Sequence, residues 1–156
     1  VDWKSLYADS SNEANFRSWL RLVLGDEGKH IQKEGYATSP VRDVIGFMTF
    51  RFLALTTAYD KWNAIGRQVS DYAALARFVD EHTITGRVLR MEDLNVDILD
   101  MLGSVGVDIS LEALEAIGKT NTSSHRKYDT YYDDETYRLV ADRDRLIIER
   151  YGYQMF

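Results

Sequence analysis

The apolar residues of this chain recur mostly at steps of three and four, in segments that begin at capping residues and end near glycine. Such steps place side chains along one face of an α-helix, whereas a half-buried strand needs strict alternation. A helical pattern therefore accounts for most of the sequence. The segments that follow it run from about 11 to 24, 40 to 59, 70 to 82, 94 to either 103 or 106, 110 to 118 and 133 to 152.

Residues that can cap a helix stand at the start of these segments. Ser10 precedes Glu13 by three residues, which is the spacing of a capping box, and Ser39 precedes a proline at the first helical position. The segment from 40 to 59 is apolar nearly all round, so we expect it to form the buried centre of the fold. Three further residues predict N-caps in the same way: Ser70, Ser110 and Asp133.

One short run departs from helical spacing. The residues from Gly86 to Met91 have the length and the glycine boundary of a β-strand, and no other run is as convincing. A lone strand leaves its backbone groups without partners, so it either pairs with the edge of another molecule or belongs to a sheet outside this sequence. We therefore expect a mainly α fold with one to three short strands.

Length and cysteine content limit the class of protein. The 156 residues contain no linker and no repeat, so we expect a single domain over 1–156. A chain of this length can bury a core without support from a metal or a disulfide. The absence of cysteine excludes disulfides, thiolate metal sites and thiol catalysis, and it favours a reducing compartment, which predicts a cytoplasmic protein.

Net charge and hydropathy bear on possible partners. Nineteen Lys and Arg residues against twenty-five Asp and Glu residues give a net charge of −6, which argues against a general nucleic-acid or anionic-membrane surface. No apolar run approaches the roughly 18 residues of a membrane span. We therefore expect no nucleic-acid partner and no membrane contact.

Neither the histidines nor the common catalytic motifs indicate a site. His30, His82 and His125 lie about fifty residues apart, outside any spacing typical of a metal site, so we expect no metal. The sequence has no GxSxG elbow, no GxGxxG turn and no GxxxxGK(S/T) loop. We therefore assign no catalytic residue.

The segment from 119 to 128 differs from the acidic background. It carries three positive charges, no acid, and a series of hydroxyl and amide donors. Such donors can surround a phosphate or sulfate while Arg126 binds it through two N–H groups and Lys127 adds a point charge. The alternative is a solvated surface loop in which the Ser and Thr side chains form turns.

Several short segments follow one another in a particular order: Arg90 to Leu94 with Asp97, Asn121 to His125, Tyr128, Tyr131 to Asp133, and Tyr151 to Tyr153 before Phe156. Together they resemble the C-terminal part of sulfotransferases. In that family an Arg-x-Glu-x-Leu run ends a strand, and an Asn-x-Ser loop, a Tyr-Tyr-Asp segment and a Phe/Tyr-Gly-Tyr ending follow. The segment that holds Phe16 and Trp19 is similar to the family's Phe-x-x-Trp-Leu helix.

The resemblance implies an α/β protein that moves a sulfuryl group from 3′-phosphoadenosine 5′-phosphosulfate to a hydroxyl or amine. It implies that the loop closing over this nucleotide contains the residues that we predict as the site: Asn121, Ser123, Ser124, Arg126 and Lys127. The family's P-loop-like donor loop has no counterpart in this sequence. We therefore expect the C-terminal portion of a longer protein, inactive by itself, with an acceptor that the sequence does not identify.

A second interpretation is a helical protein-interaction or dimerisation module without catalysis. The strand from Val88 to Met91 and the apolar face of residues 41–55 are both covered more easily with a partner surface. We therefore expect a homodimer or a larger homo-oligomer.

Overall fold

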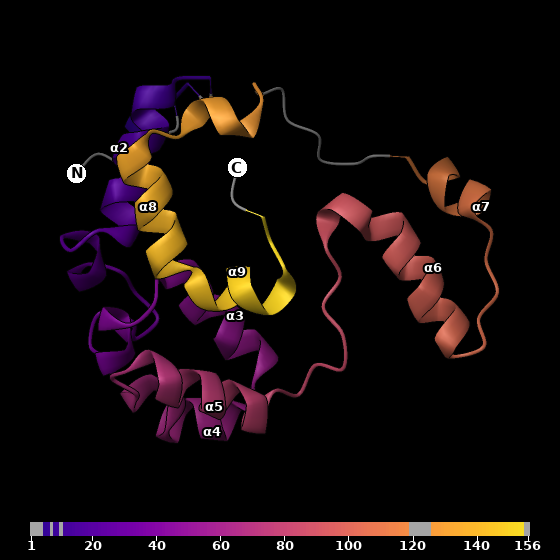
Figure 1. The fold of residues 1–156 in the computed structure, drawn as a ribbon, viewed down its shortest axis with the longest axis horizontal. Helices are drawn as coiled ribbons and strands as arrows, with labels where there is room; N and C mark the ends of the chain where they lie inside the picture. Colours follow the sequence, from indigo (N-terminus) through magenta and orange to yellow (C-terminus); the bar gives the residue numbers. More distant parts are fainter. Residues whose placement is uncertain (1–4, 7, 10, 119–125, 155–156) are drawn as a thin grey trace. The chain divides into compact units, whose positions relative to one another are not determined.

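The computed structural model describes residues 5, 6, 8, 9, 11–118 and 126–154. These residues form two compact units (Figure 1). Unit 1 holds the described residues within 1–84 and 125–156, and unit 2 holds those within 85–124. We describe each unit by itself, and the single domain over 1–156 stays a prediction.

Unit 1 joins helices from both ends of the chain. Its helices are α2 (Glu13–Leu24), α3 (Phe47–Thr56), α4 (Tyr59–Ala64), α5 (Tyr72–His82), α8 (Asp134–Arg143) and α9 (Arg145–Tyr151). Short 3-10 helices lie between them at Gly28–His30, Pro40–Asp43, Gly66–Gln68 and Tyr128–Tyr131. Helices α2 and α8 lie side by side (Figure 1), although they are far apart in the sequence. The predicted mainly helical fold is confirmed.

Two clusters of buried apolar side chains form the interior of unit 1. In the smaller, Leu20, Val23 and Leu24 of α2 pack against Leu139 and Val140 of α8. Removal of this apolar surface from water stabilises the pairing of the two helices, at about 25 cal/mol per Å². The larger cluster consists of Tyr36, Val41, Ile45, Phe50, Leu53, Trp62, Leu75, Phe78, Val79 and Leu146.

The helix expected over 40–59 is divided at Gly46, so its predicted extent is wrong. A 3-10 helix ends at Asp43, and α3 begins after Gly46, whose ψ of 164° is extended. The N–H of Gly46 donates to the carbonyl of Arg143 at 2.7 Å, and a Cβ added to Gly46 would lie 2.8 Å from Cδ2 of Leu24. The close approach of two other segments therefore interrupts the helix.

The apolar residues of 41–55 are covered in part by the chain itself. Val41, Ile45, Phe50 and Leu53 are at most 2% exposed, whereas Met48 and Leu55 are 50% and 78% exposed. The prediction of a buried centre is therefore confirmed for one side of this segment only. The homodimer stays a prediction.

The segment expected as one C-terminal helix is two helices in the structure. Asp133 caps α8 as predicted: its carboxylate accepts from the N–H of Thr136, whose hydroxyl accepts from the N–H of Asp133. Gly152 ends α9 with φ at 66°, in the left-handed region that favours glycine. The helix is interrupted between them at Asp144, whose carboxylate accepts a hydrogen bond from the hydroxyl of Thr49 in α3.

The starts of α2, α5, α6 and α7 lie within two residues of the predicted ones. Ser110 caps its helix as predicted. The cap of α5 is Asp71, one residue after Ser70, and the cap of α2 is Asn12, whose side chain accepts from the N–H of Asn15. Ser10, expected to cap this helix, lies outside the described residues.

Unit 2 contains α6 (Leu94–Ser104) and α7 (Leu111–Ala116), preceded by a 3-10 helix at Met91–Asp93. The two α-helices contact each other. Gly106, with φ at 78°, ends α6. The N–H of Val107 donates to the carbonyl of Leu102 at 2.9 Å and that of Gly106 to Gly103 at 3.0 Å, as in a Schellman motif.

The strand predicted over Gly86–Met91 is wrong. Among the described residues, β pairing is limited to an isolated antiparallel bridge between Thr57 and Thr83. No strand lies alongside residues 86–90, so their backbone has no ladder to join. The N–H of Arg90 instead donates to the carboxylate of Asp97 at 3.2 Å.

No helix within the described part of the chain is long and apolar enough to cross a membrane.

Candidate functional site

The predicted anion-binding residues lie in the sequence where the chain passes from unit 2, which ends at 124, back to unit 1. Asn121, Ser123 and Ser124 fall outside the described residues. Arg126 and Lys127 belong to unit 1 and come directly before the 3-10 helix Tyr128–Tyr131. The structure therefore places two of the five predicted residues.

Hydrogen bonds fix the backbone at these two residues. The N–H of Arg126 donates to the hydroxyl of Tyr131 at 3.2 Å. The carbonyl of Lys127 accepts from the N–H of Thr130 at 3.2 Å and from its hydroxyl at 2.8 Å. The start of the 3-10 helix thus sets where the Arg126 side chain leaves the backbone.

Aromatic contacts anchor this 3-10 helix on α2. The ring of Phe16 lies edge-on to Tyr131, with ring centroids 5.3 Å apart, and to Tyr132, with centroids 5.2 Å apart. Edge-to-face pairs place the positive edge of one ring on the negative face of another. The contact joins two segments that carry the sulfotransferase resemblance.

Arg17, next to Phe16, binds the same segment through its carbonyl oxygens. Its Nε donates to the carbonyl of Tyr131 at 2.9 Å, and Nη2 donates to those of Thr130 and Tyr132 at 3.3 and 3.4 Å. The fixed, planar arrangement of guanidinium N–H groups suits three successive carbonyls.

One turn along α2, Arg21 binds the start of α8. Nη2 of Arg21 lies 3.0 Å from the carboxylate of Asp133 and 2.7 Å from that of Glu135. Hydrogen bonds from Thr136, with a further contribution from Arg21, lower the pKa of Asp133 to about 2. The cap of α8 is therefore ionised at neutral pH and tied to α2.

An open pocket of about 420 Å³ lies beside Arg126. Its lining comes from the start of α2 and the residues before it: Asp9, Ser11, Asn12, Glu13, Ala14 and Arg17, together with Arg126. Two guanidinium groups and two carboxylates thus face one hollow. The pocket is a composite of segments that are more than a hundred residues apart.

Within this pocket, Glu13 stands between the two arginines. Its carboxylate lies 3.0 Å from Nη1 of Arg126 and 3.5 Å from Nη2 of Arg17. The Arg126 side chain is 63% exposed, so the ion pair is in contact with solvent. Glu13 therefore occupies the position that an external anion would take between these guanidinium groups.

Asp9 adds a second negative charge to the pocket. The hydroxyl and the N–H of Ser11 donate to its carboxylate at 2.7 and 2.9 Å, and these hydrogen bonds lower the pKa of Asp9. The charge of Arg126 also lowers it. The pocket is therefore balanced in charge at neutral pH.

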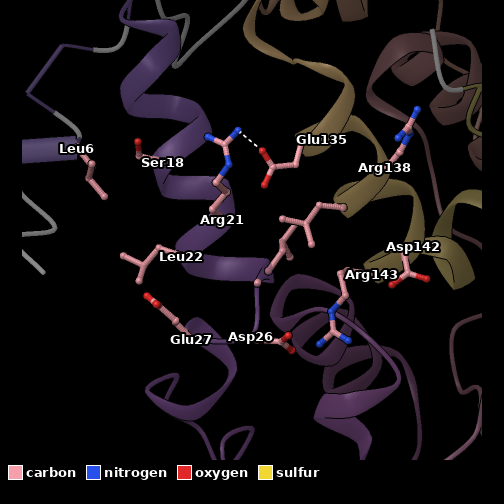
Figure 2. A pocket seen from close by; sticks show the side chains of 13 residues that line it. Leu6, Ser18, Arg21, Leu22, Asp26, Glu27, Glu135, Arg138, Asp142 and Arg143 are labelled. Atoms are coloured by element: carbon pink, nitrogen blue, oxygen red, sulfur yellow. Dashed lines mark hydrogen bonds and ion pairs between the residues drawn. The ribbon is translucent and has the colours of Figure 1, made fainter.

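A second, larger hollow of about 870 Å³ lies between α2 and α8 (Figure 2). Its polar lining includes both Arg21, which reaches Glu135, and Arg143. Nη2 of Arg143 donates to the hydroxyl of Tyr36 at 2.9 Å and to the carbonyl of Ile45 at 2.8 Å. Arg21 thus joins α2 to α8, and Arg143 joins α8 to residues 36–45, and the lining points to no class of ligand.

The described residues contain no cluster of three or more side chains that could hold a metal ion.

Comparisons with known proteins find no family model, no curated protein and no solved structure that matches this chain. The resemblance to sulfotransferases thus stays a prediction from the residues.

The structure adds Glu13 and Arg17 to the predicted site. Glu13 lies 113 residues before Arg126, and Arg17 lies four residues after Glu13. Both belong to a helix predicted from its apolar spacing and from a capping box, in which Glu13 had only a capping role. No local pattern pairs them with the loop, because the pairing depends on how α2 packs on the C-terminal segment.

Proposed function

We propose that this chain is part of a sulfotransferase-like protein and that Arg126 and Lys127 bind a phosphate of the donor nucleotide. The transfer breaks the bond between sulfur and the bridging oxygen of 3′-phosphoadenosine 5′-phosphosulfate. A bond then forms between sulfur and the acceptor oxygen or nitrogen, and the proton of the acceptor passes to a base that this chain does not identify. The chain alone is inactive, because the sequence lacks the phosphosulfate loop.

The contact between Phe16 and the Tyr131–Tyr132 pair is the observation that carries the proposal. These residues come from two segments of the resemblance that are far apart in sequence. Their contact brings Arg126 to the wall of a pocket that Arg17 also lines. An arginine pair with solvent access suits a phosphate, whose oxygens accept charge-assisted hydrogen bonds.

Titration calorimetry with adenosine 3′,5′-bisphosphate tests the proposal. We expect weak binding that falls as ionic strength rises, because the pocket is open to solvent. Arg126→Ala removes a charge-assisted contact and lowers the affinity about tenfold, the low end of the range for such contacts, since the side chain is mostly exposed.

Arg77→Ala is the matched control, since it removes the same charge from an exposed position on α5 that lines no part of this pocket. It leaves the affinity unchanged. The proposal fails if the nucleotide does not bind, or if binding is indifferent to the combined change of Arg126→Ala and Lys127→Ala.

A further inference from the structure

Arg17 lies on α2 but binds the segment that leads out of the candidate anion site. Its Nε and Nη2 donate to the carbonyls of three successive residues, 130–132, at 2.9 to 3.4 Å. These carbonyls lie at the end of the 3-10 helix Tyr128–Tyr131, and the last carbonyls of a helix have no partner within it. Arg17 therefore fixes the end of this short helix on α2.

The same short helix holds the backbone of Arg126. The hydroxyl of Tyr131, a residue only 6% exposed, accepts from the N–H of Arg126 at 3.2 Å. Thr130 donates from its N–H and from its hydroxyl to the carbonyl of Lys127. The residues whose carbonyls Arg17 binds thus include the two that fix the start of the basic segment. A single turn of backbone connects Arg17 to Arg126.

The donors of Arg17 are already engaged within unit 1. Nε and Nη2 bind the carbonyls, and the same two atoms lie 3.7 Å from the carboxylate of Asp133 and 3.5 Å from that of Glu13. Arg17 lends its positive charge to the pocket wall, but these two atoms hold other parts of the chain. Its geometry suits holding the segment better than binding an anion.

We propose that Arg17 is a positioning residue of the anion site, which holds the backbone of residues 130–132 on α2 and so sets where the Arg126 guanidinium lies. The inference rests on the proposed function, in which Arg126 binds a phosphate. Arg17→Lys separates geometry from charge. It keeps the positive charge, but one ammonium on a flexible stem lacks the planar set of N–H groups that three successive carbonyls need.

Titration calorimetry with adenosine 3′,5′-bisphosphate on the full chain measures the effect. We expect Arg17→Lys to lower the affinity roughly threefold to tenfold, because the Arg126 guanidinium is no longer held at the pocket. Arg21→Lys is the matched control, since Arg21 also lies on α2, pairs with Asp133 and Glu135, and lines no part of this pocket. It leaves the affinity unchanged.

A double-mutant cycle separates positioning from a loss of general stability. In the Arg126→Ala background, Arg17→Lys should change the affinity by less than about twofold, because the side chain that it positions is gone. Tyr131→Phe tests the second step, since it removes the hydroxyl that accepts from Arg126 and keeps the ring on Phe16. We expect this change to lower the affinity by about twofold to fivefold.

Amide hydrogen exchange gives a measurement that needs no nucleotide. The N–H groups of Arg126 and Thr130 should exchange at least about threefold faster in Arg17→Lys than in Arg21→Lys, because the turn that protects them is held less firmly. If the original chain does not bind the nucleotide, the proposed function fails, and these exchange rates alone decide whether Arg17 positions the segment.

Three results would overturn the inference. The first is unchanged exchange at these two N–H groups in Arg17→Lys. The second is full nucleotide affinity in Arg17→Lys or in Tyr131→Phe, since charge alone would then account for the effect of Arg17. The third is an equal loss of affinity from Arg17→Lys with and without Arg126→Ala, since Arg17 would then act independently of Arg126.

Discussion

The hydroxyl of Thr49 donates a hydrogen bond of 2.6 Å to the carboxylate of Asp144. The contact joins the first turn of α3 to the break between α8 and α9, nearly a hundred residues further along the chain. It also places a carboxylate against the N-terminus of α3, where the helix dipole favours negative charge. Burial nevertheless outweighs these contacts and raises the pKa of Asp144.

The raised pKa predicts a stability that depends on pH. The folded state binds the proton of Asp144 more tightly than the unfolded state, so this contribution is complete below the unfolded value near 3.8 and is lost as pH rises through the folded value. Asp144→Asn removes it. We expect the unfolding free energy of the variant, relative to the original chain, to increase as the pH of urea denaturation rises from about 4 to 7.

Asp142→Asn is the control for this prediction, because Asp142 is exposed and lies in α8, two residues before Asp144. Its relative stability should not follow the same trend. Parallel pH profiles for Asp144→Asn and the original chain would show that Asp144 titrates alike in the folded and unfolded states, contrary to the prediction.

Substitution of Gly46 by a larger residue is expected to disturb packing and so to destabilise the fold. The φ of −75° at Gly46 is open to any residue, so the cost of Gly46→Ala comes from space. The added Cβ would lie 2.8 Å from Leu24 and 3.2 Å from Cβ of Arg143, and we expect a loss of about 1–3 kcal/mol in chemical denaturation. Gly103→Ala, where a Cβ meets nothing within 4 Å, should have no such cost. Equal effects of the two changes would contradict the packing argument.

Replacement of Arg143 is expected to lower the free energy of unfolding, because it leaves carbonyl groups without their hydrogen-bond donor. Arg143 donates to the carbonyl of Ile45 at 2.8 Å, to that of Asp43 at 3.4 Å and to the hydroxyl of Tyr36. Arg143→Met keeps much of the apolar stem and removes these donors, so we expect a loss of about 2–4 kcal/mol in thermal or urea unfolding. Arg138→Met, on the same helix, should change stability by less than about 0.5 kcal/mol. The prediction is wrong if both variants unfold alike.

The position of Glu13 predicts an increase in anion affinity. Glu13→Gln removes the carboxylate that lies between Arg17 and Arg126 but keeps a side chain of the same size. Since an exposed ion pair contributes little, we expect adenosine 3′,5′-bisphosphate to bind about two- to fivefold more tightly by calorimetry. Glu27→Gln, which makes the same change outside this pocket, should leave the affinity as it was. A weaker affinity in Glu13→Gln would mean that the carboxylate does not compete with the anion.

Local signals predicted the helices well where a cap and a periodic face coincide, as at Ser110 and Asp133. They failed where a distant segment intervenes. The break at Gly46 depends on Arg143, and the break at Asp144 depends on Thr49, and neither partner is near in sequence. The strand at Gly86–Met91 failed for the opposite reason, since its composition suits a sheet that the described residues do not provide.

The candidate site, too, could be predicted from the sequence only where the signal is local. The charge of Arg126 and Lys127 is visible in the sequence as a local excess over an acidic background. The carboxylate that pairs with Arg126 is not visible in the sequence, because the packing of Phe16 on Tyr131 brings Glu13 to Arg126. Sequence spacing identifies a basic loop, whereas its competition with an internal acid is a property of the folded chain.

The pairing of α2 with α8 sets an order of events while the protein is being synthesised. Arg21 leaves the ribosome 112 residues before Asp133, its partner at the start of α8. At roughly 5 to 20 residues per second, the apolar face of α2 then waits on the order of 5 to 20 seconds before the helix that covers it exists. During that interval Leu20 and Val23 are open to chaperones and to neighbouring nascent chains. Unit 1 therefore matures only after the last helices emerge, and a chain that stops before α8 leaves this face uncovered.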